Sequence, residues 1–92
     1  MKVVINGCYG GFSLSDEAVK RLGLESAYGK ISRTDATLVQ MVEEDPEGTS
    51  GRFAELEVVE IPDNATDWMI NEYDGMESIT AVVDGKFWFD ED

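Results

Sequence analysis

Two Asp-Gly pairs divide residues 68–89 into short apolar runs, and this pattern restricts the fold more than any other part of the sequence. The pairs are Asp74-Gly75 and Asp84-Gly85, and apolar residues alternate with polar ones around them. Asp-Gly favours a two-residue type I′ turn because both central residues of that turn have positive φ. The sequence therefore predicts two β-hairpins that share residues 76–83 as their middle strand.

Two-residue turns also set the register of both hairpins. Glu72 is then opposite Glu77, with Asp74 in the turn between them. Like charges at facing positions destabilise a β-ladder by a few tenths to about 1 kcal/mol, so we expect these acids to serve an interaction outside the fold. The other predicted pairs are Tyr73 with Met76, Val83 with Lys86, Val82 with Phe87, and Ala81 with Trp88.

The chain is strongly acidic, and the acid is concentrated in its second half. It has 20 acidic and 7 basic residues with no histidine, and its net charge is −13. Residues 1–42 have a net charge of +1 and residues 43–92 one of −14. The second half is also rich in β-branched and aromatic residues, which favours a folded sheet with an acidic outer face over a disordered tail. The alternative is that the acid only keeps a small domain soluble.

These properties exclude several classes of function. Direct binding to nucleic acid or to an anionic membrane is disfavoured because both repel an acidic protein. A lone Cys8 and the absence of histidine exclude an internal disulfide and the usual zinc sites. An EF-hand beginning at Asp45 fails because Ser50 and Leu56 occupy its required Gly and Glu positions. We expect no metal and no cofactor.

The 92 residues predict a single domain, 1–92, in the cytoplasm. No apolar run approaches the roughly 20 residues of a membrane helix, and the start lacks the apolar stretch of a signal peptide. Residues 2–5 predict a buried strand, and residues 16–22 a helix with Ser15 as its N-cap and Gly23 as its stop.

A second helix is expected after Thr34 or Asp35 and ends at residues 43–46, where acids oppose the helix dipole. Residues 47–52 predict a loop and residues 53–58 a half-exposed strand. Its alternation shifts near Val58, which a bulge or burial of both faces would explain. The expected fold class is α+β, with two short N-terminal helices packed on a mainly antiparallel sheet that ends in a β-meander.

The glycine-rich segment 6–11 follows the first strand, as a phosphate-binding loop would. It matches neither the dinucleotide fingerprint nor the P-loop, and the helix behind it opens with Asp16 and Glu17. We therefore interpret its glycines as permitting a tight reversal. Cys8 has no histidine to activate it, so an inert buried thiol is favoured over a nucleophile.

The opening Met1–Ser15, with the motif NGCYGGFSLS, resembles a widespread group of small proteins encoded by bacteriophages and prophages. Residues 33–35, 58–63 and 72–77 extend the resemblance, and Ser78 departs from it because a bulky residue is expected there. The resemblance brings no catalytic motif. Small acidic proteins of mobile elements include anti-CRISPR proteins, some of which imitate DNA in the basic channel of a surveillance complex, and the resemblance implies that class.

The favoured function is an acidic inhibitor that binds the basic nucleic-acid-binding surface of a host defence complex such as a CRISPR surveillance complex. Strand neighbours about 5 Å apart, and i, i+2 residues about 7 Å apart, would present carboxylates at spacings comparable with DNA phosphates. The aromatic candidates could instead pack in the core. The predicted partner-binding residues are the acids Glu55, Glu57, Glu72, Asp74 and Glu77, with Trp68 and Tyr73 as aromatic anchors.

Two other classes stay open. An enzyme is not expected, because only carboxylate chemistry is available and a small domain has little room for a cleft. The alternative to the inhibitor is a phage structural or interaction module, in which acidity serves only solubility and the partner binds through apolar residues. A complex that ignores salt would favour this module.

Overall fold

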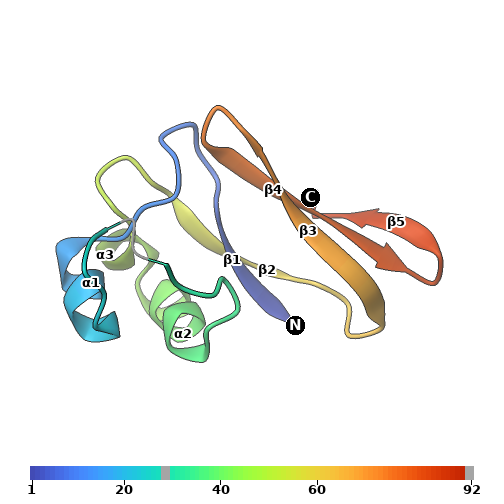
Figure 1. Ribbon diagram of the computed structural model, residues 1–92, viewed down its shortest axis with the longest axis horizontal. Coiled ribbons are helices and arrows are strands. Elements are labelled where there is room, and N and C mark those ends of the chain that lie inside the picture. Colours follow the sequence, from blue (N-terminus) through green and yellow to red (C-terminus); the bar gives the residue numbers. More distant parts are fainter. Residues whose placement is uncertain (28–29, 91–92) are drawn as a thin grey trace.

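The computed structural model describes residues 1–27 and 30–90, which form three layers (Figure 1). Helices lie on one side, a two-stranded sheet lies in the middle, and a three-stranded sheet lies on the other side. In chain order the elements are β1 (Lys2–Asn6), α1 (Asp16–Leu22), α2 (Ala36–Glu44), α3 (Pro46–Thr49), β2 (Leu56–Glu60), β3 (Ala65–Tyr73), β4 (Met76–Val83) and β5 (Lys86–Phe89).

The α+β content and the antiparallel pairing agree with the sequence prediction, whereas the arrangement differs in two respects. The helices lie between β1 and β2 in the chain and not at its N-terminus, and there are three of them in the described residues. The strands form two separate sheets, β1-β2 and β3-β4-β5, instead of one. The sequence could not show this because sheet membership depends on contacts between distant strands.

The β1-β2 sheet is buried on both faces, which explains the shift in alternation near Val58. Val4 and Val58 pack with the helices, while Val59 and Ile61 pack toward β3-β4-β5. The register runs without interruption from Lys2–Glu60 to Asn6–Leu56, so there is no bulge in this ladder. The predicted strand start at residue 53 is wrong: β2 begins at Leu56, and residues 52–53 form a turn.

The helices begin where capping side chains satisfy free backbone N–H groups. α1 has the predicted bounds, with Ser15 accepting from Ala18 N at 3.1 Å. Asp35 caps α2 in the same way. α3 includes residues 47–49, which were predicted as part of a loop, and Asp45 both ends α2 and caps α3 through Gly48 N at 3.0 Å. The unfavourable acid at the end of α2 therefore stabilises the next helix.

The β3-β4-β5 meander has the predicted register throughout its two hairpins. Its inner face contributes Ile70, Ile79 and Ala81 to a cluster with residues of β1. A register shift between Ala65 and Asp67 marks the start of β3. No helix in the described part of the chain is both long enough and apolar enough to cross a membrane.

Candidate functional site

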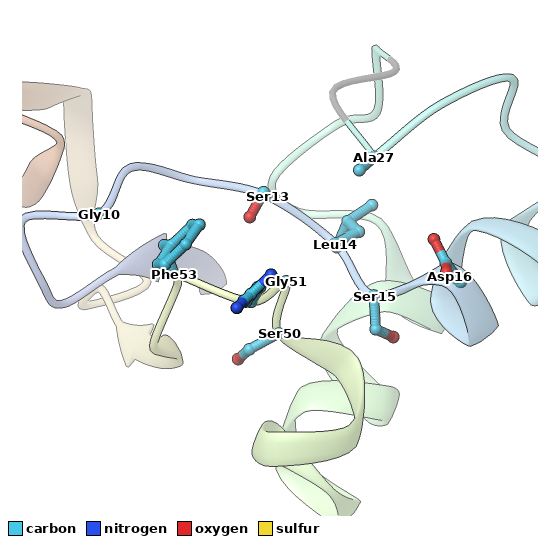
Figure 2. A pocket seen from close by; sticks show the side chains of 10 residues that line it. Gly10, Ser13, Leu14, Ser15, Asp16, Ala27, Ser50, Gly51 and Phe53 are labelled. Carbon is cyan, nitrogen blue, oxygen red and sulfur yellow. The ribbon is translucent and has the colours of Figure 1, made fainter.

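A pocket of about 380 Å³ lies between residues 10–16 and 50–53 (Figure 2). Two of its hydroxyl groups are engaged within the fold. Ser15 Oγ donates to Gly48 O at 2.6 Å, and Ser50 Oγ donates to Pro46 O at 2.6 Å and accepts from Leu56 N at 2.9 Å. Neither histidine nor cysteine lines the pocket, and no cluster of three metal-ligating side chains occurs among the described residues. Ser15 and Ser50 are thus bonded within the fold, and we take the exposed surface as the candidate site.

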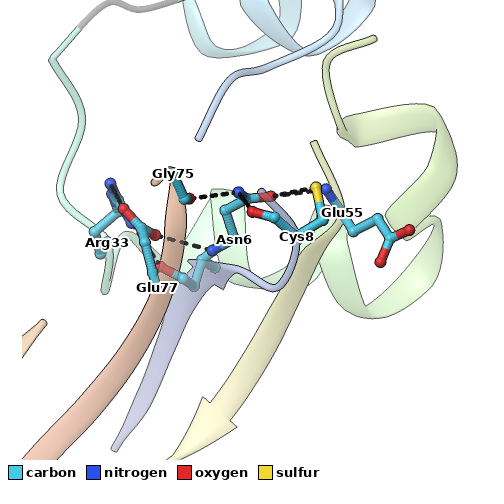
Figure 3. A network of polar contacts seen from close by, with 7 residues as sticks. Asn6, Cys8, Arg33, Glu55, Gly75 and Glu77 are labelled. Carbon is cyan, nitrogen blue, oxygen red and sulfur yellow. Dashed lines mark hydrogen bonds and ion pairs between the residues drawn. The ribbon is translucent and has the colours of Figure 1, made fainter. Parts of the chain in front are cut away.

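Asn6 joins three segments that are far apart in the sequence (Figure 3). Its side-chain amide donates to Cys8 O at 2.7 Å and to Gly75 O at 2.8 Å, and its Oδ1 accepts from Glu55 N at 2.8 Å. The Cys8 thiol donates to Phe53 O at 3.1 Å, and Cys8 is half-buried, not buried as the sequence predicted. Asn6 is fully buried, and it brings the turn of the first hairpin beside the segment that leads into β2.

Arg33 and Glu77 form a bidentate ion pair beside Asn6 (Figure 3). Nη1–Oε1 is 2.6 Å and Nη2–Oε2 is 2.9 Å, and Glu77 Oε1 also accepts from Asn6 N at 2.9 Å. The guanidinium lies 3.6 Å from the centre of the Phe12 ring. Only 7% of the Glu77 side chain is exposed, so this carboxylate binds inside the molecule and offers little surface to a partner.

The ion pair changes the interpretation of Glu72 opposite Glu77. The register is as predicted, but the two carboxylates have separate partners. Glu77 pairs with Arg33, and Glu72 Oε2 accepts from Gly75 N at 2.6 Å. The like-charge pair thus has an explanation within the fold, and it does not by itself indicate an external partner.

The remaining predicted acids are exposed and belong to segments that Asn6 joins or to their neighbours, and Figure 3 shows the Glu55 side chain pointing away from Gly75 and Glu77. Glu72 and Asp74 flank the hairpin turn that Asn6 binds, and Glu55 donates its backbone N–H to Asn6. Glu57 belongs to this group because its Oε2 would lie 2.8 Å from a Cβ placed on Gly7. We call these four side chains the acidic rim. Arg33 does not neutralise the rim, since its guanidinium is bonded to Glu77.

The structure separates the two predicted aromatic anchors. Trp68 packs in the core cluster between the sheets, as the alternative interpretation of its role proposed. Tyr73 is 73% exposed and adjoins the acidic rim residues Glu72 and Asp74. The two residues are five positions apart on β3, so they lie roughly 17 Å apart and on opposite faces of the sheet.

A further exposed surface was missing from the sequence prediction: the side of the meander that faces away from β1-β2. We call it the outer face. It carries Met69, Phe87 and Phe89, each at least half exposed, together with Tyr73 and the half-buried Val82. A signal was present in the run Phe87-Trp88-Phe89, because alternation along a strand must place aromatic rings on both faces of the sheet.

At the start of β1, the end of the strand away from Asn6, exposed charges are paired within the chain. Lys2 Nζ lies 2.7 Å from Glu43 Oε2, and this hydrogen bond raises the pKa of Lys2. Because the pKa of Lys2 is higher in the folded than in the unfolded protein, the pair stabilises the fold at pH values below the pKa of the unfolded state. This stabilisation is lost as the pH rises through the pKa of the folded state. Glu43 is therefore engaged with Lys2.

Comparisons of the chain with protein-family models, with curated proteins and with solved structures find no match.

Proposed function

We propose that this protein is an acidic inhibitor of phage or mobile-element origin that binds the basic nucleic-acid-binding surface of a host defence complex, as DNA-mimicking anti-CRISPR proteins do. The acidic rim carries this proposal. Its support is that Glu55, Glu57, Glu72 and Asp74 are exposed on a molecule with a net charge of −13, while the Arg33 guanidinium is bonded to Glu77.

Charge governs the expected behaviour of the complex. Clustered carboxylates attract a basic channel from a distance and accelerate encounter, and they repel nucleic acid itself. The Debye length is about 10 Å at 0.1 M salt and falls to about 3 Å at 1 M, so binding through the rim weakens as salt increases. The partner is thus a basic protein complex in the host cytoplasm, and the protein needs neither cofactor nor catalytic residues for this role.

A pull-down from bacterial host lysate at about 50 mM and about 500 mM salt tests the proposal. We expect a basic nucleoprotein to be retained at low salt, released at high salt and displaced by competing DNA. A variant with Glu55→Lys, Glu72→Lys and Asp74→Asn should bind at least about tenfold more weakly, since exposed charges at an interface act mainly through long-range attraction. Asparagine is chosen at position 74 because it tolerates the positive φ of 50° there.

The matched control makes the same change in net charge on the helical side, with Glu25→Lys, Glu47→Lys and Asp16→Asn, three exposed acids. It should weaken binding much less than the rim variant. Equal losses would mean that only net charge matters. A partner that both rim and control variants bind like the wild type, at either salt concentration, would rule out the rim as the binding site.

The outer face favours a second candidate function, an interaction or structural module of a phage in which acidity serves solubility. Four large hydrophobic side chains are exposed there, and apolar contact does not depend on electrostatic attraction. A partner retained at high salt and unaffected by DNA would support this second function.

A further inference from the structure

The outer face concentrates the exposed apolar surface of the molecule. Seven large hydrophobic side chains are exposed in the described part of the chain, and four of them lie on this one face: Met69 at 58%, Tyr73 at 73%, Phe87 at 74% and Phe89 at 52%. Single exposed apolar residues are ordinary, whereas a contiguous group marks an interaction site.

The strand register shows that most of this group is contiguous. Met69, Thr80 and Phe89 form one row across the three strands, and Asp67, Val82 and Phe87 form the next. Neighbouring strands are about 4.8 Å apart, and the rings of Phe87 and Phe89 have centroids 6.5 Å apart. The two rows therefore bring Met69, Val82, Phe87 and Phe89 together in one area of the sheet, which also includes Thr80 and Asp67.

The charges around this area are negative. Asp67 lies in one of the two rows, and Asp74 and Asp84 occupy the turns at the two ends of the sheet. Lys86, the only basic residue between positions 65 and 90, faces the inner side because it pairs with Val83. An occupant of the outer face thus meets apolar side chains flanked by carboxylates.

The combination of apolar side chains and flanking carboxylates restricts which kind of molecule can bind the outer face. Nucleic acid is repelled by the carboxylates, and a second copy of the chain would bring another net charge of −13 and the same aspartates to the interface. A protein segment that carries both apolar and cationic side chains can contact the apolar side chains of the two rows and pair with the aspartates at the same time.

We propose that the outer face docks a segment of the partner protein in which apolar side chains alternate with lysine or arginine. The inference rests on the proposed function in that the partner is basic, and it adds an apolar contact that salt does not screen. Phe87 and Phe89 anchor the segment, since large aromatic side chains that become buried in an interface supply much of its binding energy.

Titration of the isotopically labelled protein with defined peptides, followed by NMR, tests this directly. The probes are a peptide of alternating valine and lysine, a peptide of alternating valine and glutamate, and oligolysine. We expect the valine–lysine peptide to shift the amides of Met69, Thr80, Val82 and Phe87, with an affinity that falls at about 500 mM salt because the attraction between lysine and aspartate is then screened. Oligolysine should shift only acidic positions and lose its effect at high salt, and the valine–glutamate peptide should cause no shifts.

A double variant, Phe87→Thr with Phe89→Thr, should bind the valine–lysine peptide at least about tenfold more weakly, as expected for two interface anchors. Threonine suits a strand, so we expect the melting temperature to stay within about 3 °C of the wild type. The matched control is Phe53→Thr, which removes a ring of similar exposure outside the sheet and should leave binding unchanged.

Three results would overturn the inference: wild-type affinity in the Phe87/Phe89 variant, equal binding of the valine–glutamate peptide, or a dimer that forms through the outer face in the absence of peptide. These outcomes leave the acidic rim untouched. Failure of the proposed function is a separate result, in which the rim variant and its charge-matched control retain a host partner equally well.

Discussion

The two Asp-Gly turns have the same sequence and the same backbone, but they have different surroundings. Asp74 and Gly75 have φ of 50° and 89°, and Asp84 and Gly85 have φ of 52° and 75°. A Cβ placed on Gly75 would lie 2.6 Å from Gly11 N and 2.7 Å from Tyr9 O, whereas one on Gly85 would meet no atom within 4 Å. The first turn is packed against the glycine-rich segment, whereas the second is exposed to solvent, with Asn64 Nδ2 donating to Asp84 Oδ1 at 3.4 Å.

The difference shows that a turn can be specified locally and still acquire a tertiary role. Asp-Gly suffices for the type I′ conformation at both places because the dipeptide tolerates positive φ. Docking of the first turn needs Asn6 and Arg33, which come from distant parts of the chain, together with Glu77 beside the turn. The packed turn at Asp74-Gly75 fixes the position of Glu72 and Asp74 in the acidic rim. The exposed turn at Asp84-Gly85 leaves β5 and its two exposed phenylalanines accessible to a partner.

The largest expected effect comes from removing the cation behind the docked turn. Arg33→Met leaves Glu77 buried without its partner, and breaking one side of a buried ion pair costs about 3–5 kcal/mol. That is a large share of the roughly 5–15 kcal/mol that stabilises a typical domain. Urea denaturation followed by tryptophan fluorescence measures the loss.

Arg52→Met is the matched control for this change. Arg52 is exposed, and its guanidinium lies 5.3 Å from the centre of the Phe53 ring. We expect a loss below about 0.5 kcal/mol, as for most surface substitutions. Equal effects of the two arginine substitutions would contradict the importance assigned to the Arg33–Glu77 pair.

A smaller loss is expected from Asn6→Ala. The substitution leaves Glu55 N, Gly75 O and Cys8 O without the partner that they have in the fold, and each buried unpaired group costs about 1–3 kcal/mol. Partial access to water after the change limits the total to about 2–4 kcal/mol. Thermal melts measure it, and hydrogen exchange should show faster opening at the first turn than at the second.

Asn64→Ala is the corresponding control, because Asn64 is exposed and its amide makes one long contact of 3.4 Å with Asp84. Its effect should be below about 0.5 kcal/mol. If Asn6→Ala is no more harmful than this control, the link between β1 and the first turn does not stabilise the fold.

The finest test compares Gly75→Ala with Gly85→Ala. Both alanines adopt positive φ, which costs roughly 1–2 kcal/mol for an L-residue. Only Gly75→Ala also forces a methyl group against backbone atoms, and overpacking adds about 1–3 kcal/mol. The difference in free energy of unfolding between the two variants therefore measures the docking, and a difference of zero would mean that the first turn moves aside without cost.

Several elements could be predicted from the sequence because their causes lie close together in the chain. Ser15 and Gly23 bound α1 as predicted, and both hairpins have the register that two-residue turns impose. The predicted strand start at residue 53 was wrong because alternation of apolar and polar residues does not distinguish β2 from the turn that precedes it. Of the predicted site residues, the rim acids are exposed, whereas the Glu77 side chain is buried and Trp68 packs against the core.

The sequence by itself determined the two hairpins, the capped helices and the strong acidity of the second half, since each depends on residue type and short-range geometry. The tertiary structure alone decided which acids are exposed and which face of the meander is exposed to solvent. Arg33 reaches Glu77 across 44 positions, and β1-β2 covers only one side of β3-β4-β5. Such contacts follow from how separate layers pack, and no local pattern of residues specifies them.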